Sequence, residues 1–315
     1  MLLDIVVPHY NEPWEIVRPF INMINSQKGV DFRDFRVLLV HDGVDPFPEK
    51  YLEGPANIQQ IVQEKRGVSA ARNYGIDHSE AKWINFSDCD DCYSSVLSLY
   101  LIFNVLRDDE QYNLFWSPFY MVRSDNTLRQ FPEYTPVFIH NKYYRLSFLK
   151  EKDIRFCEKL HMSEDSAFNA IVEARMKEGL IGSIDYKFPL YAWCRRKGSV
   201  TLNPDIAIYN MEGHFDRNLY VLDEFRKHPA LNSDIMVGRT LTDAYAMLTK
   251  PDLNGDASKF LKRVSEFYLE NREAYQGISE ADKAKLLRVS DLESGITEEI
   301  RASRKPLDEW LESLV

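Results

Sequence analysis

The chain has 315 residues, of which 28% are charged and 44% are hydrophobic, as in a globular protein with a substantial core. Its formal net charge of -10 disfavours non-specific binding to nucleic acid or to anionic membranes. No apolar stretch approaches the roughly 18 residues that a membrane-spanning helix requires. The four cysteines do not resemble a disulfide framework, and no signal-like segment precedes the first predicted strand. We therefore expect a cytoplasmic location, with any membrane association peripheral.

The first ninety residues alternate predicted strands and helices. Apolar runs predict strands at residues 2–7, 36–40 and 83–86, of which the first reads as buried. Residues 58–62 can form a further strand. Apolar residues recur at helical spacing after Pro13, which predicts a helix packed on the sheet. Strand, helix and strand in this order favour parallel pairing in an α/β fold.

Polar residues follow several of these strands. Ligands of open parallel sheets bind beyond the carboxyl ends of the strands, so Asn11 and Asp42 should face one crevice that could hold a base or ribose. A simple turn explains Asp42 equally well. Arg66 and Arg72 lie near the start of a small-residue helix, where free amides also attract anions, so this surface could bind a diphosphate.

Three carboxylates within four residues follow the strand at 83–86, in the sequence SDCDD at 87–91. Crowded carboxylates in a partly buried site require a cation or hydrogen-bond donors. Oxygen ligands of this kind suit Mg²⁺ or Mn²⁺. A solvated acidic loop or a helix cap is the alternative interpretation.

Four segments, in this order, resemble glycosyltransferase family 2, whose members have the GT-A fold. They are VVPHYNE at 6–12, VHDG at 40–43, GVSAARN at 67–73 and FSDCDD at 86–91. His41 stands where the family more usually has an acid. The resemblance implies a Rossmann-like mixed sheet flanked by helices and a nucleoside-diphosphate sugar donor, with UDP the expected carrier. The donor-binding residues that it implies are Pro8, Tyr10, Asn11, Glu12, Asp42, Arg66, Arg72, Asp88, Arg195 and Arg196.

The same resemblance implies individual roles. Asp42 would contact the base and Asp88 the ribose, while Asp90, with Asp88, would hold the Mn²⁺ or Mg²⁺ ion that bridges the diphosphate. Arg72 would lie near the base or the phosphates. Asp91 is expected to play a supporting part.

The next hundred residues carry the expected acceptor half. Apolar spacing predicts a helix over residues 93–106. Residues 114–116 and 119–122 resemble hairpin or edge strands, with a turn at 124–126. Trp116 and Tyr120 could stack on a sugar or pack in the core. Ser163 is a suitable cap for a helix over residues 166–176.

An acid pair, Glu164 and Asp165, precedes that helix in the sequence HMSED. Acids at helix starts are commonly explained by the helix dipole. The family 2 resemblance implies instead that Asp165 is the general base for an acceptor hydroxyl and that Glu164 orients the acceptor. An inverting displacement follows from the resemblance alone. A basic loop after residue 194, with Arg195, Arg196 and Lys197, could close over the diphosphate or be a solvated turn.

The resemblance covers residues 2–202. We therefore expect a catalytic domain over 1–204, with a donor half at about 1–92 and an acceptor half at about 93–204, and a helical C-terminal extension over 205–315. The extension could build the acceptor site or form a homo-oligomer. Its predicted helices are at 209–225, 241–248, 260–268 and 300–314, with breaks at 254–255 and 277–279.

The predicted function is a metal-dependent, inverting glycosyltransferase that moves a sugar from a UDP-linked donor to a hydroxyl of a glycan or another acceptor. Three alternatives stay open: a nucleotidyltransferase on a related sheet, a non-catalytic GT-A-like binding protein, and an enzyme that glycosylates hydroxymethylated DNA bases. The negative net charge disfavours the DNA acceptor.

Overall fold

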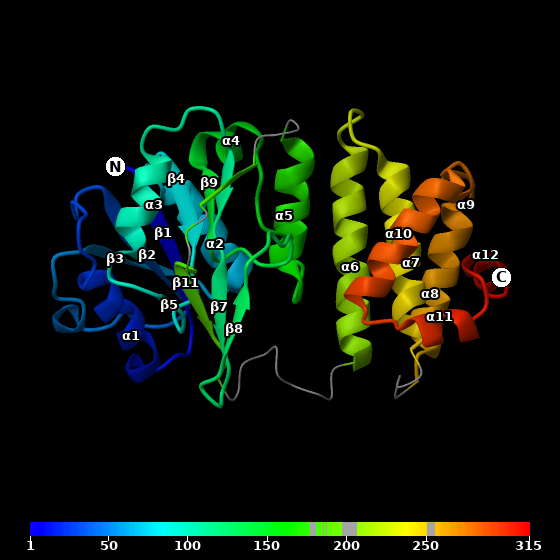
Figure 1. The fold of residues 1–315 in the computed structure, drawn as a ribbon, viewed down its shortest axis with the longest axis horizontal. Helices are drawn as coiled ribbons and strands as arrows, with labels where there is room; N and C mark the ends of the chain where they lie inside the picture. The colour runs from blue at the N-terminus through cyan, green and yellow to red at the C-terminus, as the bar shows by residue number, and fades with distance from the viewer. Residues whose placement is uncertain (177–180, 185, 187, 197–206, 251–255) are drawn as a thin grey trace. The chain divides into compact units, whose positions relative to one another are not determined.

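The computed structural model describes residues 1–176, 181–184, 186, 188–196, 207–250 and 256–315 (Figure 1). They form two compact units. The first contains Met1–Lys159 and the described residues from Glu164 to Arg196, and the second contains Leu160–Ser163 and the described residues from Ala207 onward. The predicted domain boundary at 204, the predicted break at 254–255 and Lys197 lie outside the described residues.

A seven-stranded mixed sheet, in the order β10-β6-β9-β4-β1-β2-β3, lies at the centre of the first unit. β1 pairs in parallel with β2 and β4, whereas β9 runs antiparallel to β4 and β6. The predicted parallel pairing of the first two strands is therefore confirmed. The strands are β1 Leu3–His9, β2 Phe35–Asp42, β3 Asn57–Gln63, β4 Trp83–Phe86, β6 Leu114–Trp116, β9 Lys142–Arg145 and β10 Ile181–Ser183.

Helices cover both faces of this sheet, because alternate side chains of a buried strand point to opposite faces. Ile5 of β1 belongs to one apolar cluster with Phe20 of α1 and Phe103 of α3. α2 lies against Val6: a Cβ at Gly75 would be 2.3 Å from a Val6 methyl carbon, so glycine permits this close approach. The helices of this unit are α1 Trp14–Asn25, η1 Glu49–Tyr51, α2 Val68–His78, α3 Ser98–Leu106, α4 Leu146–Glu151 and α5 Glu164–Arg175.

A smaller sheet has the strand order β5-β11-β7-β8. The turn predicted at 124–126 joins β7 to β8 and is confirmed. The strand at 119–122 forms a hairpin with β8 through this turn, as predicted. The interpretation of 114–116 as a hairpin or edge strand is wrong, because this strand lies between β10 and β9. The strands of this sheet are β5 Cys92–Tyr93, β7 Phe119–Val122, β8 Leu128–Phe131 and β11 Tyr191–Cys194.

The helix predicted from residue 93 begins instead at Ser98. Tyr93 is fully buried in β5, where it pairs with Tyr191 of β11. This strand pairing joins residues almost a hundred positions apart, and such tertiary contacts override local helical spacing.

The second unit is helical in its described part. Helices cover the predicted spans 209–225, 241–248 and 260–268, and the predicted break at 277–279 separates α9 from α10. The continuous helix predicted over 300–314 is wrong, because Pro306 lies between α11 and α12 and cannot continue a helix. None of the helices in the described residues is long and apolar enough to cross a membrane. They are α6 Ala207–Arg226, α7 Ser233–Leu248, α8 Ser258–Glu270, α9 Arg272–Gln276, α10 Glu280–Glu293, α11 Glu298–Ser303 and α12 Leu307–Glu312.

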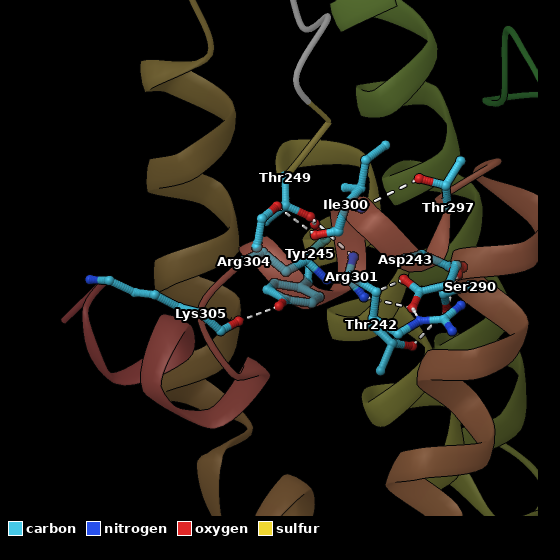
Figure 2. A network of polar contacts seen from close by, with 12 residues as sticks. Thr242, Asp243, Tyr245, Thr249, Ser290, Thr297, Ile300, Arg301, Arg304 and Lys305 are labelled. Atoms are coloured by element: carbon cyan, nitrogen blue, oxygen red, sulfur yellow. Dashed lines mark hydrogen bonds and ion pairs between the residues drawn. The ribbon is translucent and has the colours of Figure 1, made fainter.

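A polar network stabilises this helical unit (Figure 2). Asp291 of α10 is fully buried and accepts hydrogen bonds from Arg304 at 2.5 and 2.6 Å and from Arg301 at 2.9 Å. Ser290, also on α10, donates to Asp243 of α7 at 2.6 Å. The buried residues of α10 are Ser290 and Asp291, so the helix has no buried apolar stripe. Helices are predicted from such stripes, and the sequence therefore did not predict α10.

Replacing Asp291 with asparagine should lower the free energy of unfolding by about 3 kcal/mol, because the buried Arg304 guanidinium would lose its carboxylate. Urea unfolding of the whole chain, followed by circular dichroism, measures this change. The exposed Asp234, substituted in the same way, is the matched control. Equal stabilities of the two variants would contradict a stabilising role for the buried pair.

Candidate active site

The carboxyl ends of β1, β2 and β4 lie next to one another in the main sheet. His9 at the end of β1 is in register with His41 of β2, so the segment at 10–12 and Asp42 leave the sheet side by side. The acidic segment at 87–91 follows β4, which pairs with β1 on its other side. Three of the predicted donor-binding segments therefore meet at one edge of the sheet.

Asp42 organises the loop that leads into α2. Its buried carboxylate accepts hydrogen bonds at 2.8 Å from the backbone amides of Arg66 and Gly67 and from the Gln63 side chain. The Arg66 side chain points elsewhere and pairs with Glu158 at 2.6 Å. Asp42 thus has a structural role in this loop, which is compatible with a further contact to a ligand because a carboxylate can accept about four hydrogen bonds.

Tyr10 and Lys65 form an exposed rim beside Asp42. The Lys65 ammonium lies 4.1 Å from the centre of the Tyr10 ring and donates a hydrogen bond to its hydroxyl. This hydrogen bond and the positive charge lower the pKa of Tyr10. Asn11 is exposed and Pro8 is half-buried on the same segment. Sequence reasoning missed Lys65, whose only signal was its position beside Arg66 before the helix.

Arg72 is the centre of the site. Although it is almost fully buried, its Nη1 donates to Asp165 at 2.7 Å and to Glu164 at 2.9 Å, and its Nη2 donates to Asp88 at 3.2 Å. The guanidinium also lies 5.4 Å from the centre of the Phe156 ring. One cation on α2 therefore joins the acidic segment after β4 to the acid pair that starts α5.

The surroundings of Arg72 change the pKa values of two of its carboxylate partners, Asp165 and Asp88. Burial raises the pKa of Asp165 well above its usual range, against the opposing effect of Arg72 and with the help of the neighbouring charges on Glu164 and Asp88. Partial desolvation likewise raises the pKa of Asp88, against the effect of Arg72 and with the help of the nearby charges on Asp90 and Glu164. A carboxylate whose pKa is raised is a better proton acceptor than an ordinary aspartate, so Asp165 suits general base chemistry.

A second cluster joins Asp90 to β11 and to the loop after β1. Arg196 donates to Asp90 at 2.6 Å through Nε and to Glu12 at 3.1 Å through Nη2. The neighbouring Arg195 is directed away from this cluster, because its Nη1 contacts Met121 at 3.9 Å and its guanidinium lies 5.6 Å from the centre of the Trp193 ring. The structure therefore brings Arg196, but not Arg195, to the acidic segment.

Asp91 is buried and binds the smaller sheet. Its carboxylate accepts hydrogen bonds from the Tyr191 hydroxyl at 2.9 Å and from the Cys194 amide at 2.7 Å. These contacts hold the acidic segment against β11, next to Arg196. They are consistent with the supporting part expected of this residue.

A divalent metal such as Mg²⁺ needs several oxygen ligands. Within the described ranges, no three His, Cys, Asp or Glu side chains form a group that could hold a metal by themselves. Mg²⁺ is usually bound by one or two carboxylates together with water and substrate phosphates. Asp88 and Asp90 supply two partly exposed carboxylates, and their chemistry fits such a shared site.

The model of the family described as "Glycosyl transferase family 2" matches residues 4–176. The chain is 29% identical over 198 residues to the uncharacterized glycosyltransferase EpsJ of Bacillus subtilis, covering 53% of this chain and 55% of that protein. It is 24% identical over 251 residues to the minor teichoic acid biosynthesis protein GgaB of the same organism, covering 71% of this chain and 27% of that protein. The chain thus spans about half, or less, of the length of these relatives.

Several solved structures resemble almost the whole chain. Residues 1–349 of TarS from S. aureus, in complex with UDP, match with a TM-score of 0.66 at 16% identity, covering 96% of this chain and 92% of that one. The mannosyltransferase PcManGT from Pyrobaculum calidifontis, in complex with GDP-Man and Mn²⁺, matches with a TM-score of 0.53 at 13% identity, covering 99% and 83%. The predicted GT-A fold with a helical C-terminal region is confirmed.

Proposed function

The chain belongs to glycosyltransferase family 2 and is a transferase enzyme, and from this membership we propose that it moves a sugar from UDP to an acceptor hydroxyl with inversion. The observation that carries the proposal is the triple contact of Arg72 with Asp88, Glu164 and Asp165. Through it, the acid expected to bind the donor and the acid expected to activate the acceptor share one guanidinium.

The proposed donor site is the edge of the sheet beyond β1, β2 and β4. Tyr10 and Lys65 are exposed beside Asp42, which suits an aromatic and polar surface for the base. Asp88, the proposed ribose ligand, also accepts a hydrogen bond from the buried Arg72, so donor binding and the position of this cation affect each other. The UDP in the similar TarS structure supports a uridine nucleotide as the carrier.

In the proposed reaction, Asp165 accepts the proton of the acceptor hydroxyl as its oxygen bonds to the anomeric carbon. The bond from that carbon to the donor diphosphate breaks, and UDP leaves with the electron pair. Arg72 holds Asp165 in place, and Glu164 on the same nitrogen of Arg72 orients the acceptor.

Asp88 and Asp90 would hold the divalent cation, Mn²⁺ or Mg²⁺. Such an ion would supply charge neutralisation for the diphosphate leaving group. When the ion takes Asp90, the Arg196 guanidinium that pairs with this carboxylate is released and can supply a further positive charge to the diphosphate. The Mn²⁺ in the similar mannosyltransferase structure supports this assignment.

For the acceptor, we propose a hydroxyl of a glycan or of a teichoic-acid type of polymer. The similarity to GgaB, a protein of minor teichoic acid biosynthesis, supports this class.

Calorimetric titration with UDP and thermal shift with UDP-linked sugars, both with Mn²⁺ present, test the donor assignment. We expect UDP to bind and to raise the Tm, and a UDP-linked sugar to be slowly hydrolysed when no acceptor is present. If GDP stabilises the protein and UDP does not, the base assignment is wrong. If no nucleotide or nucleotide sugar has any effect, the donor site is wrong.

Replacing Arg196 with glutamine should increase the affinity for Mn²⁺ without nucleotide by about tenfold, because the guanidinium and the cation compete for Asp90. Electron paramagnetic resonance of free Mn²⁺ measures this without any turnover. Arg195→Gln is the matched control, since that side chain points away from Asp90. Asp90→Asn should abolish the binding. Equal Mn²⁺ affinities of the wild type and the Arg196→Gln variant would contradict the competition.

A further inference from the structure

Two buried histidines face each other behind the proposed donor site. His9 ends β1 and His41 is its neighbour in β2, and their Nδ1 atoms are 2.9 Å apart. The rings meet nearly edge to face, with an interplanar angle of 81°. His9 is 5% exposed and His41 is fully buried, so water cannot easily replace this contact.

The outer nitrogen of each ring must carry a hydrogen. Nε2 of His9 lies 2.8 Å from the carbonyl oxygen of Glu12, which can only accept. Nε2 of His41 lies 3.0 Å from Oε1 of Gln60. The orientation of that amide is determined by Phe47, because Oε1 accepts from the Phe47 amide at 2.7 Å and Nε2 donates to the Phe47 carbonyl at 2.9 Å. Both Nε2 atoms are therefore donors.

The two Nδ1 atoms are then left facing each other. With no proton between them, two lone pairs would meet at 2.9 Å, and with two protons, two N–H groups would meet. A single proton satisfies both atoms. We propose that His9 and His41 share one proton, carry one positive charge between them, and position the two loops of the donor site through this shared hydrogen bond.

Other properties of the pair agree with one charge rather than two. Burial and the nearby His9 lower the pKa of His41 to about 4, which opposes a second proton. The carboxylates around the pair are Glu12, next to His9, and Glu49, which accepts from Gln60 at 3.0 Å. On the remaining side the Phe47 ring packs against both imidazoles, with centroid distances of 4.6 and 5.6 Å.

The pair is connected to the site described above, so the inference rests on the proposed function. His9 is followed by Tyr10 and Glu12, and His41 by Asp42, all expected to contact the donor. Glu12 in turn contacts Arg196, the partner of Asp90. Loss of the shared proton would leave two facing lone pairs, separate the two strand ends and weaken donor binding. Neither histidine touches the reacting atoms, and both are positioning residues.

Two-bond ¹H–¹⁵N spectra of protein labelled at histidine test the shared proton without any ligand. The His9→Asn and His41→Asn variants assign the signals among the seven histidines. We expect a proton on each Nε2 and one proton shared by the two Nδ1 atoms. The four ring nitrogens of His9 and His41 should therefore carry three protons in all. A total of two or of four would overturn the proposal. This measurement is made on the wild type, so a variant that fails to fold does not affect it.

Titration of UDP binding against pH tests the positioning role. As the spectra report loss of the shared proton at rising pH, the Kd for UDP should increase roughly five- to tenfold in the wild type. His41→Asn should bind weakly throughout, whereas His41→Asp should restore binding by pairing with a charged His9. The exposed His78→Asn is the control and should behave as the wild type. A Kd that stays constant while the proton is lost would overturn the positioning role. Absence of UDP binding in every variant would refute the donor assignment instead and leave the spectra to decide the proton count.

Discussion

Replacing Asp165 with asparagine is expected to lower kcat for sugar transfer by about 10²- to 10⁴-fold, which is the usual contribution of a positioned general base. The asparagine side chain keeps the size of the aspartate and can still accept a hydrogen bond from Arg72. UDP binding should therefore change little. Steady-state kinetics with a UDP-linked sugar and calorimetry with UDP separate the two effects.

The pH dependence gives an independent check. Because the base must be ionised and burial raises the pKa of Asp165, the protonated fraction persists to higher pH than for an ordinary aspartate, whose pKa is about 3.9. The wild-type kcat/KM should fall as the pH falls through this raised pKa. Asp125→Asn, in the exposed turn between β7 and β8, is the matched control. Unchanged turnover in the Asp165→Asn variant would assign the base to another residue.

Replacing Arg72 with glutamine should lower the free energy of unfolding by about 3–5 kcal/mol, as expected when one member of a buried ionic cluster is removed. The three carboxylates on its guanidinium would be left to repel one another without a compensating charge. Transfer activity should also be lost, since both sides of the site depend on this cation. Urea unfolding and initial-rate assays measure the two effects.

Two control variants interpret that result. Arg33 pairs with Asp31 at 2.6 Å but is 90% exposed, so Arg33→Gln should leave the urea midpoint within experimental error. Arg72→Lys keeps the charge but loses the planar geometry that contacts three acids, and intermediate stability is expected. If Arg72→Gln is as stable as Arg33→Gln, the cluster does not stabilise the fold.

The positions of the strands in the first ninety residues were largely predictable, because most of them are short apolar runs followed by a polar residue. All residues of β2 are buried, as a central parallel strand requires, and its apolar sequence shows this directly. The residues at the carboxyl ends were predictable for the same reason. Parallel strands end at one edge of a sheet, so Asn11 and Asp42 could be assigned to one crevice, and the resemblance to family 2 added the acidic segment.

The contacts within the site were not predictable. The role of Arg72 as a shared partner of acids 16, 92 and 93 residues away depends on how α2 and α5 pack, which local spacing does not reveal. Arg195 and Arg196 follow the last residue of β11, and their different contacts, with Met121 and with Asp90, depend on tertiary packing that the sequence does not reveal. α10 was missed because its buried face is polar, and hydrophobic periodicity does not detect a polar face.

The contact between Arg72 and the start of α5 also constrains the order in which the chain is assembled. During synthesis, the strands β1 to β4 and helix α2 leave the ribosome before residues 164 and 165 exist. Until then, Asp88 alone can neutralise the guanidinium that α2 carries into the interior. A fragment that ends before α5 would therefore contain the donor residues but lack two of the three acids that make burial of Arg72 favourable. The donor half of this enzyme should not fold stably when it is produced by itself.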